Sequence, residues 1–131
     1  MQLAVQSATP LRVYVVEDSP LVQERLEQLL EAVSAKLVGS ARGAQEAIRG
    51  ILAEHPDLVV LDLRLAEGSG FDVLRALHDR APGIDVLMLT NFASEPYRRT
   101  AERLGARGFF DKSTEFDGVR AALEARAQRV H

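Results

Sequence analysis

Short apolar runs alternate with amphipathic stretches along this chain, and the alternation limits the possible folds more than any other sequence feature. The runs cover residues 11–16, 36–41, 58–62, 84–90 and 108–112. After each run, apolar residues recur at spacings of three and four, as in helices with one buried face. A strand followed by a helix, repeated five times, predicts an α/β fold: a parallel sheet with helices on both faces.

Some helix boundaries carry signals of their own. Ser19 followed by Pro20 predicts the start of the first helix, because a serine hydroxyl caps a helix and proline suits its first position. Pro56 ends the second helical stretch, since proline cannot continue a helix. Thr114, with Asp117 three residues later, predicts a capped start of the last helix at Thr114.

Length and composition exclude several classes of protein. The 131 residues predict a single domain, with its core at about residues 11–127. Lys and Arg total 16 against 19 Asp and Glu, a net charge of −3, so nucleic acid is not expected as a direct partner. The absence of cysteine excludes thiolate chemistry and zinc–sulfur sites. No apolar run approaches the ~18 residues of a membrane span. We therefore expect a cytoplasmic protein with no membrane partner.

Polar residues follow four of the five predicted strands. Glu17 and Asp18 come after the first, Asp62 ends the third, Thr90 ends the fourth and Lys112 follows the fifth. Ligands of open parallel sheets bind beyond the carboxyl ends of the strands. These side chains are therefore expected to converge at one edge of the sheet.

Such crowding of carboxylates favours a metal ion. Two carboxylates ~4 Å apart repel by about 4 kcal/mol at an effective dielectric constant near 20. Mg²⁺ suits one to three carboxylates together with water and phosphate oxygens, and Mn²⁺ could substitute for it. A carboxylate beside Mg²⁺ can attack phosphorus and form an acyl phosphate. Asp62 is the predicted acceptor, with Thr90 and Lys112 placed to bind the phosphoryl group.

With these residues in place, the sequence resembles the receiver domain of two-component response regulators, of the single-domain, chemotaxis-regulator-like kind. The resemblance covers about residues 11–127. It rests on VVEDSP, PDLVVLDLRL, Gly70, LMLTNFA and GARGFFDKS, in that order along the chain. It implies a flavodoxin-like fold with strand order 2-1-3-4-5.

The resemblance also implies a chemistry. A sensor histidine kinase or phosphotransfer protein would donate a phosphoryl group to Asp62. Mg²⁺ would be held by Glu17, Asp18, Asp62 and the backbone carbonyl of Arg64. In this family, the residues at the positions of Arg64 and Phe92 flank the phosphoryl group and tune its hydrolysis.

A conformational switch is implied as well. Thr90 would move toward the phosphoryl group, Lys112 would bind it, and Phe109 would change rotamer. The surface of the fourth helix, fifth strand and last helix would then be remodelled, and this surface binds a downstream protein target or a second copy. Where the family often has a proline in a cis bond, this chain has Ser113, so the Lys112–Ser113 bond is expected to be trans.

Structural explanations for the same residues stay open. Asp62 could cap the following segment, Thr90 could be an ordinary strand residue, Lys112 a solvated lysine and Phe109 simple core packing. A further basic stretch could be a solvated face, or could meet an acidic partner or a second copy. It contains Arg98, Arg99, Arg103 and Arg107.

Other functions are weighed against the receiver. A Mg²⁺-dependent phosphohydrolase with an aspartyl nucleophile generally needs a second carboxylate two residues later, where this chain has Arg64. Flavin binding would need a phosphate cradle after the first strand, where the acidic EDSP carries the wrong charge. A docking module without phosphorylation remains the third alternative. We therefore expect a phosphoacceptor signalling domain and not an enzyme acting on external substrates.

Overall fold

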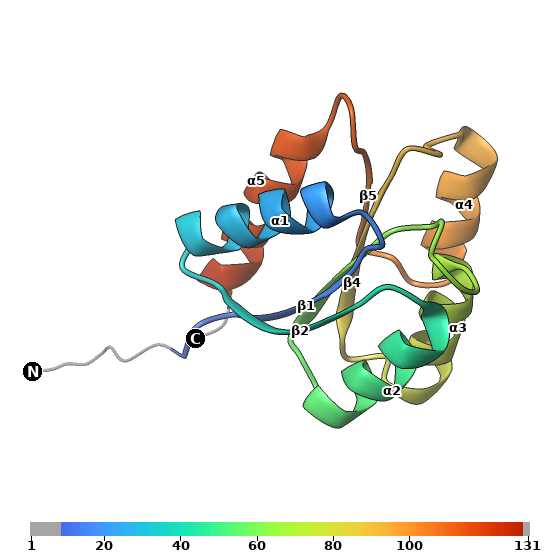
Figure 1. The fold of residues 1–131 in the computed structure, drawn as a ribbon, viewed down its shortest axis with the longest axis horizontal. Coiled ribbons are helices and arrows are strands. Elements are labelled where there is room, and N and C mark those ends of the chain that lie inside the picture. Colours follow the sequence, from blue (N-terminus) through green and yellow to red (C-terminus); the bar gives the residue numbers. More distant parts are fainter. Residues whose placement is uncertain (1–8, 130–131) are drawn as a thin grey trace, which may run out of the picture.

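The computed structural model describes residues 9–129 as a five-stranded parallel sheet with helices on both faces (Figure 1). The strands are β1 (Arg12–Val16), β2 (Lys36–Ala41), β3 (Leu58–Leu61), β4 (Asp85–Thr90) and β5 (Gly108–Asp111). The helices are α1 (Pro20–Ala32), α2 (Ala44–Glu54), α3 (Gly70–Arg80), α4 (Glu95–Arg103) and α5 (Phe116–Gln128). Within residues 9–129, no helix is both long and apolar enough to cross a membrane.

The strand order is β2-β1-β3-β4-β5, which confirms the flavodoxin-like order that the family resemblance implies. The order reverses between β1 and β3, and ligands of such sheets bind at this reversal. The register pairs Val16 of β1 with Leu61 of β3. The residues that follow them, Glu17 and Asp62, therefore leave the sheet side by side.

Helices cover the two faces of the sheet unequally. α1 and α5 lie on one face, and α2, α3 and α4 lie on the other (Figure 1). Successive strand residues alternate between the two cores: Val13 and Val15 pack beside α1 and α5, while Tyr14 and Val16 pack on the opposite side. β3 is buried along its whole length, which explains why residues 58–61 form an uninterrupted apolar run.

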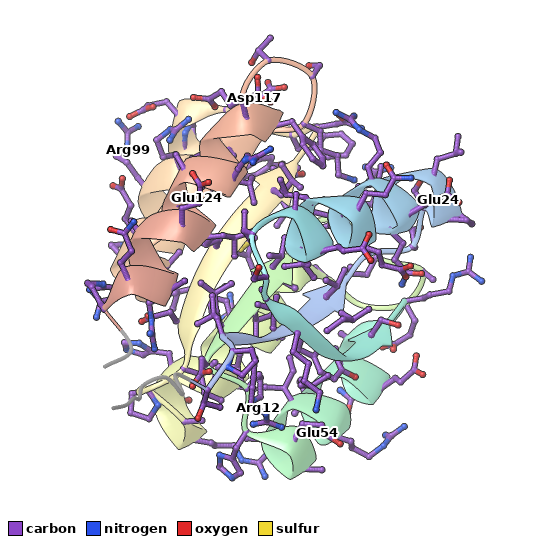
Figure 2. The ribbon with its side chains drawn as sticks, turned by 90° about the vertical axis from the view of Figure 1, so that its left-hand side faces the viewer. Arg12, Glu24, Glu54, Arg99, Asp117 and Glu124 are labelled. Carbon is purple, nitrogen blue, oxygen red and sulfur yellow. The ribbon has the colours of Figure 1, made fainter. Side chains whose placement is uncertain are left out.

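Polar contacts fix the far end of the sheet, away from the carboxyl ends of the strands. Arg12 of β1 donates to the backbone oxygen of His55 at 2.8 Å and pairs with Glu54 at 3.3 Å, which holds the end of α2 (Figure 2). Asp85, the first residue of β4, pairs with Arg107 at 3.3 Å and also with Arg126 of α5. The last turns of α5 are thereby tied to the sheet.

Two predicted helix starts have different outcomes. Ser19 caps α1, and its side chain accepts from the backbone nitrogen of Val22 at 3.4 Å, as expected. The prediction that the last helix begins at Thr114 is wrong: α5 begins at Phe116, with Glu115 at the N-cap. The reason is a turn in which the Glu115 backbone nitrogen donates to the backbone oxygen of Asp111 at 2.8 Å, so Thr114 lies inside the turn.

The loop before α3 ends in a capping box that was not predicted from the sequence. The Ser69 side chain accepts from the Asp72 backbone nitrogen, and the Asp72 side chain accepts from that of Ser69. All peptide bonds among the described residues are trans, so the expected trans bond between Lys112 and Ser113 is confirmed.

Gly70, the first residue of α3, lies against the backbone that follows β3. A Cβ atom at this position would lie 2.2 Å from the backbone oxygen of Asp62 and 2.9 Å from the Cα of Leu63. Backbone atoms cannot move aside as a flexible side chain can, so Gly70→Ala is expected to lower the free energy of unfolding by about 1–3 kcal/mol. Urea denaturation measures the change.

Gly83→Ala is the matched control, because a Cβ at Gly83 meets nothing within 4 Å. It is expected to leave the denaturation midpoint within error of the original chain. Equal stability of the two variants would contradict the proposed close contact at Gly70.

Candidate functional site

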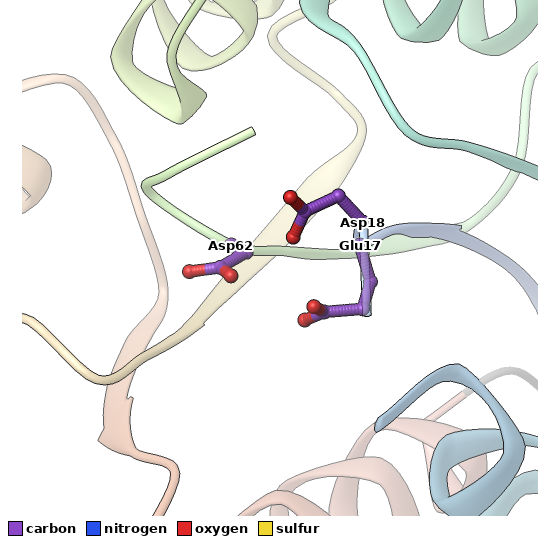
Figure 3. Close-up of side chains that lie close together, drawn as sticks. All are labelled: Glu17, Asp18 and Asp62. Carbon is purple, nitrogen blue, oxygen red and sulfur yellow. The ribbon is translucent and has the colours of Figure 1, made fainter. Parts of the chain in front are cut away.

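Three carboxylates meet at the carboxyl ends of β1 and β3. Glu17 and Asp18 follow β1, and Asp62 follows β3, where its backbone nitrogen donates to the Val16 oxygen at 3.0 Å. One carboxylate oxygen from each of the three lies within 4.8 Å of the others (Figure 3). The predicted convergence of these three side chains is confirmed.

Lys112 follows β5 and reaches this cluster from the other side of β4. Its Nζ lies 2.7 Å from Oδ2 of Asp62 and 2.8 Å from Oε1 of Glu17. Its backbone nitrogen donates to the Thr90 oxygen at 3.0 Å, which fixes the turn after β5. Asp62 and Glu17 are only 5% and 2% exposed, and buried charges need such a partner. Lys112 is therefore part of a buried ion-pair cluster and not a solvated surface lysine.

Burial and ion pairing act against each other on the pKa values of this cluster. Burial raises the pKa of Glu17 above its usual value, and hydrogen bonds from Lys112 and Ser19 offset only part of that rise. Burial lowers the pKa of Lys112, but the hydrogen bonds and charges of Asp62 and Glu17 outweigh it, so the Lys112 pKa is raised. Lys112 consequently remains protonated across the neutral range.

The charges of the cluster do not cancel when all its groups are ionised. Three carboxylates carry −3 and one ammonium carries +1, which leaves −2. The crowding that we expected a metal ion to relieve is thus relieved in part by Lys112. The remaining negative charge is suited to a divalent cation.

The carboxylates open onto a cavity of about 270 Å³. Its lining consists of Glu17, Asp18, Ser19, Asp62, Arg64, Asn91, Phe92 and Lys112. The acidic side chains offer carboxylate oxygens, which are the ligands that Mg²⁺ prefers. The cavity also has room for the waters that this ion retains. The residues present therefore fit a hydrated Mg²⁺ ion.

The three acidic residues differ in how free their oxygens are. In Glu17, Oε1 pairs with Lys112 and Oε2 accepts from the Ser19 backbone nitrogen at 2.9 Å. In Asp62, Oδ2 pairs with Lys112 and Oδ1 accepts from the Leu63 backbone nitrogen at 2.7 Å. Asp18 is partly exposed and lines the cavity. Asp18 thus offers the most accessible carboxylate to an incoming ion.

Arg64 and Phe92 form one wall of the cavity. The Arg64 guanidinium carbon lies 4.5 Å from the centroid of the Phe92 ring. The same two residues also line a neighbouring groove of about 290 Å³, which includes the partly exposed ring of Tyr97. The stacked pair therefore separates the cavity from this groove.

Thr90 and Phe109 are buried and are not among the residues that line the cavity. Thr90 is fully buried, and its Oγ1 accepts from the Phe92 backbone nitrogen at 3.1 Å. Phe109 is 5% exposed and packs into the core on the side of α4.

Two features of this region were not predicted from the sequence. Ser19 was predicted only as a helix cap, yet its backbone nitrogen binds Glu17, and its place directly after two acidic residues was the available signal. Arg98 covers the Phe109 ring at 4.9 Å, and no sequence signal distinguished it from the arginines around it.

Comparison with known proteins agrees with this geometry. Residues 13–124 match the response regulator receiver domain family. The chain is 35% identical over 103 residues to the DNA-binding transcriptional activator DevR/DosR of Mycobacterium tuberculosis, covering 78% of this chain and 48% of the relative. It is 32% identical over 120 residues to a protein-glutamate methylesterase/protein-glutamine glutaminase of Archaeoglobus fulgidus, covering 92% and 34%. The chain thus spans between about a third and a half of the length of these relatives.

Solved structures give the same result. The signal receiver domain of the putative response regulator NarL from Mycobacterium tuberculosis superposes with a TM-score of 0.80 at 30% identity, covering 92% of this chain and 98% of that one. The response regulator domain of Thermotoga maritima CheB also gives 0.80, at 25% identity and with 93% and 96% covered. Together with the match over residues 13–124, these likenesses show that the chain belongs to the response regulator receiver domain family.

Proposed function

We propose that this receiver domain, at about residues 11–127, takes a phosphoryl group on Asp62 from a sensor histidine kinase or a phosphotransfer protein. The observation that carries the proposal is the cluster at one cavity: Asp62 and Glu17 bound by Lys112, with Asp18 beside them. A structural cap explains Asp62 alone but gives no reason for two further carboxylates and a buried lysine at the same place.

The chemistry is a transfer between two groups. A carboxylate oxygen of Asp62 attacks phosphorus, the bond from phosphorus to the donor's histidine nitrogen breaks, and the nitrogen keeps the electron pair. Mg²⁺, when bound by Glu17, Asp18, Asp62 and the Arg64 backbone carbonyl, would neutralise the phosphoryl oxygens; Mn²⁺ would serve in its place.

Two side chains of the protein act on the product. Lys112 already contacts Asp62 and is placed to pair with a phosphoryl oxygen as its ammonium shifts from the carboxylate. Thr90 accepts a hydrogen bond from Phe92 through Oγ1, so its hydroxyl proton is free to be donated to the phosphoryl group.

The phosphohydrolase alternative is less well supported. It needs an acid or base two residues after the nucleophile, and Arg64 stands there with its guanidinium stacked on Phe92. A permanently charged guanidinium cannot exchange protons near neutral pH. Self-phosphorylation and loss of the phosphoryl group are therefore the only turnover that we propose.

The output of the domain is proposed to be a change of surface. Phosphorylation would shift Thr90 and Phe109 and alter the face formed by α4, β5 and α5, which would bind a downstream protein or a second copy. A phosphoryl group adds about −2 of charge at the acceptor, which gives the switch its electrostatic cause.

Asp62→Asn is expected to abolish phosphorylation, because an amide of the same shape is not a competent nucleophile. Incubation with acetyl phosphate and Mg²⁺, followed by intact-protein mass spectrometry, measures the gain of one phosphoryl group. The control is Asp79→Asn, which changes an exposed aspartate of α3. Phosphorylation of the Asp62→Asn variant to the same extent as the control would refute the assignment.

Asp18→Asn is expected to weaken Mg²⁺ binding by about tenfold or more, equivalent to about 1.4 kcal/mol, because it removes the most accessible negative ligand. Isothermal titration calorimetry with Mg²⁺ measures the affinity. Asp117→Asn, at the exposed start of α5, is the control and should bind Mg²⁺ normally (Figure 2). An unchanged affinity in Asp18→Asn would remove Asp18 from the metal site.

Phe92→Ala and Arg64→Ala are each expected to speed loss of the phosphoryl group severalfold, because either change opens the stacked wall to water. The decay of phosphorylated protein after removal of the donor gives the rate. Tyr97→Ala is the matched control, since Tyr97 lines the neighbouring groove and does not line the cavity. Unchanged decay in both wall variants would reject shielding by this pair.

A further inference from the structure

Arg98 of α4 contacts three separate segments of the chain. Its Nη1 donates to the backbone oxygen of Phe109 in β5 at 2.9 Å, and its Cζ lies 4.9 Å from the centroid of the Phe109 ring. Its Nη2 lies 3.7 Å from Oε1 of Glu115, in the turn before α5. Its Nε lies 3.7 Å from Oε1 of Glu95, one turn earlier in α4. One guanidinium therefore bridges α4, β5 and the β5–α5 turn.

Glu115 connects Arg98 to the turn that carries Lys112. Oε1 of Glu115 also accepts from the Asp111 backbone nitrogen at 2.9 Å, and the Glu115 backbone nitrogen donates to the Asp111 oxygen. These two bonds close the turn of residues 111–115. Lys112 lies inside that turn, and its ammonium is bound to Asp62. Arg98 thus contacts the segment that positions Lys112.

The Phe109 end of the bridge holds a buried aromatic ring. The ring is 5% exposed and lies in the core beneath α4, with the guanidinium over it. A guanidinium that stacks on a ring while it donates to a carbonyl oxygen uses both features that distinguish arginine from lysine. The ion pairs with Glu95 and Glu115 are long and partly exposed, so they orient the side chain more than they stabilise the fold.

The neighbouring arginines make different contacts. Arg103 donates to the Thr100 hydroxyl, and Arg107 pairs with Asp85 at the far end of the sheet. Arg99 is exposed and lies on the outer side of the molecule (Figure 2). The basic stretch is thus not one continuous solvated face, and Arg98 is set apart by its contact with Phe109.

We propose that Arg98 is a positioning residue that holds the Phe109 ring in its buried place and couples that ring to the turn carrying Lys112. The ring cannot leave the core without losing its contacts with the guanidinium. Arg98 therefore sets the balance between buried and exposed Phe109. Because the turn of residues 111–115 is part of the same bridge, that balance is coupled to the acceptor site.

The coupling rests on the proposed function, whereas the positioning of Phe109 does not. Coupling between two events is reciprocal. If binding at Asp62 and movement of Phe109 are linked, a change that shifts Phe109 also changes the affinity of a phosphoryl analogue. The two parts can therefore be measured separately in the same set of variants.

The positioning is tested by fluorine NMR of protein labelled with 4-fluorophenylalanine. The chain has five phenylalanines, and Phe109→Leu assigns the resonance of residue 109. Arg98→Ala should change the chemical shift of this resonance. It should also increase the difference between the chemical shifts measured in H₂O and in D₂O, because that difference grows with solvent contact. Arg98→Lys should lie between the original chain and Arg98→Ala, because lysine keeps the charge without the planar group. Arg99→Ala should leave the resonance unchanged.

An unchanged resonance in Arg98→Ala would overturn the positioning role. Circular dichroism checks that each variant is folded. If Arg98→Ala does not fold, the same comparison is made with Arg98→Lys, in which an unchanged resonance again counts against the proposal.

The coupling is tested by titrating beryllofluoride in the presence of Mg²⁺. The affinity of Arg98→Ala should differ from that of the original chain by about threefold or more, while Arg99→Ala should match the original chain. Glu115→Gln, which leaves the contacts of Arg98 with Phe109 in place, should change the affinity by a smaller factor. A displaced Phe109 resonance with an unchanged affinity would overturn the coupling. Failure of the original chain to bind beryllofluoride would instead refute the proposed function and leave the fluorine result to decide the role of Arg98.

Discussion

The proposed chemistry of this domain depends on an excess of clustered negative charge that one lysine compensates only in part. Asp62 and Glu17 are almost fully buried, and both are bound by the Lys112 ammonium, while Asp18 adds a third carboxylate beside them. The same lysine neutralises part of the resting cluster. Under the proposed function it would also bind the incoming phosphoryl group. What it leaves uncompensated is suited to a divalent ion.

The fold concentrates this charge through backbone contacts. Register between β1 and β3 puts Glu17 and Asp62 side by side, and the absence of a side chain at Gly70 lets α3 approach the backbone of Asp62. Lys112 arrives from β5, on the far side of β4, because the turn after β5 is bonded to the end of β4. The position of Asp62 is therefore set by the sheet, and the loops supply the cavity wall of Arg64 and Phe92.

Much of this arrangement could be predicted from the sequence, because it follows from periodicity and from which residue ends each strand. The five strands, their order through the family resemblance, and the meeting of Glu17, Asp18 and Asp62 are of this kind. The start of α5 was missed because the competing turn at Asp111 depends on backbone hydrogen bonds that no composition signal reveals. The contacts of Arg98 and Gly70 were missed for a related reason: each depends on how a helix packs against a neighbouring strand end, and residue spacing does not show this packing.

The uneven balance of charge around Lys112 has a consequence for how such a domain could change over time. Replacing one acid of the trio with a neutral residue of similar shape removes repulsion while the ammonium keeps at least one anionic neighbour. If Asp62 is the phosphoacceptor as proposed, losing its carboxylate would therefore destabilise the fold little. The fold of such a domain would then be kept without the proposed phosphorylation.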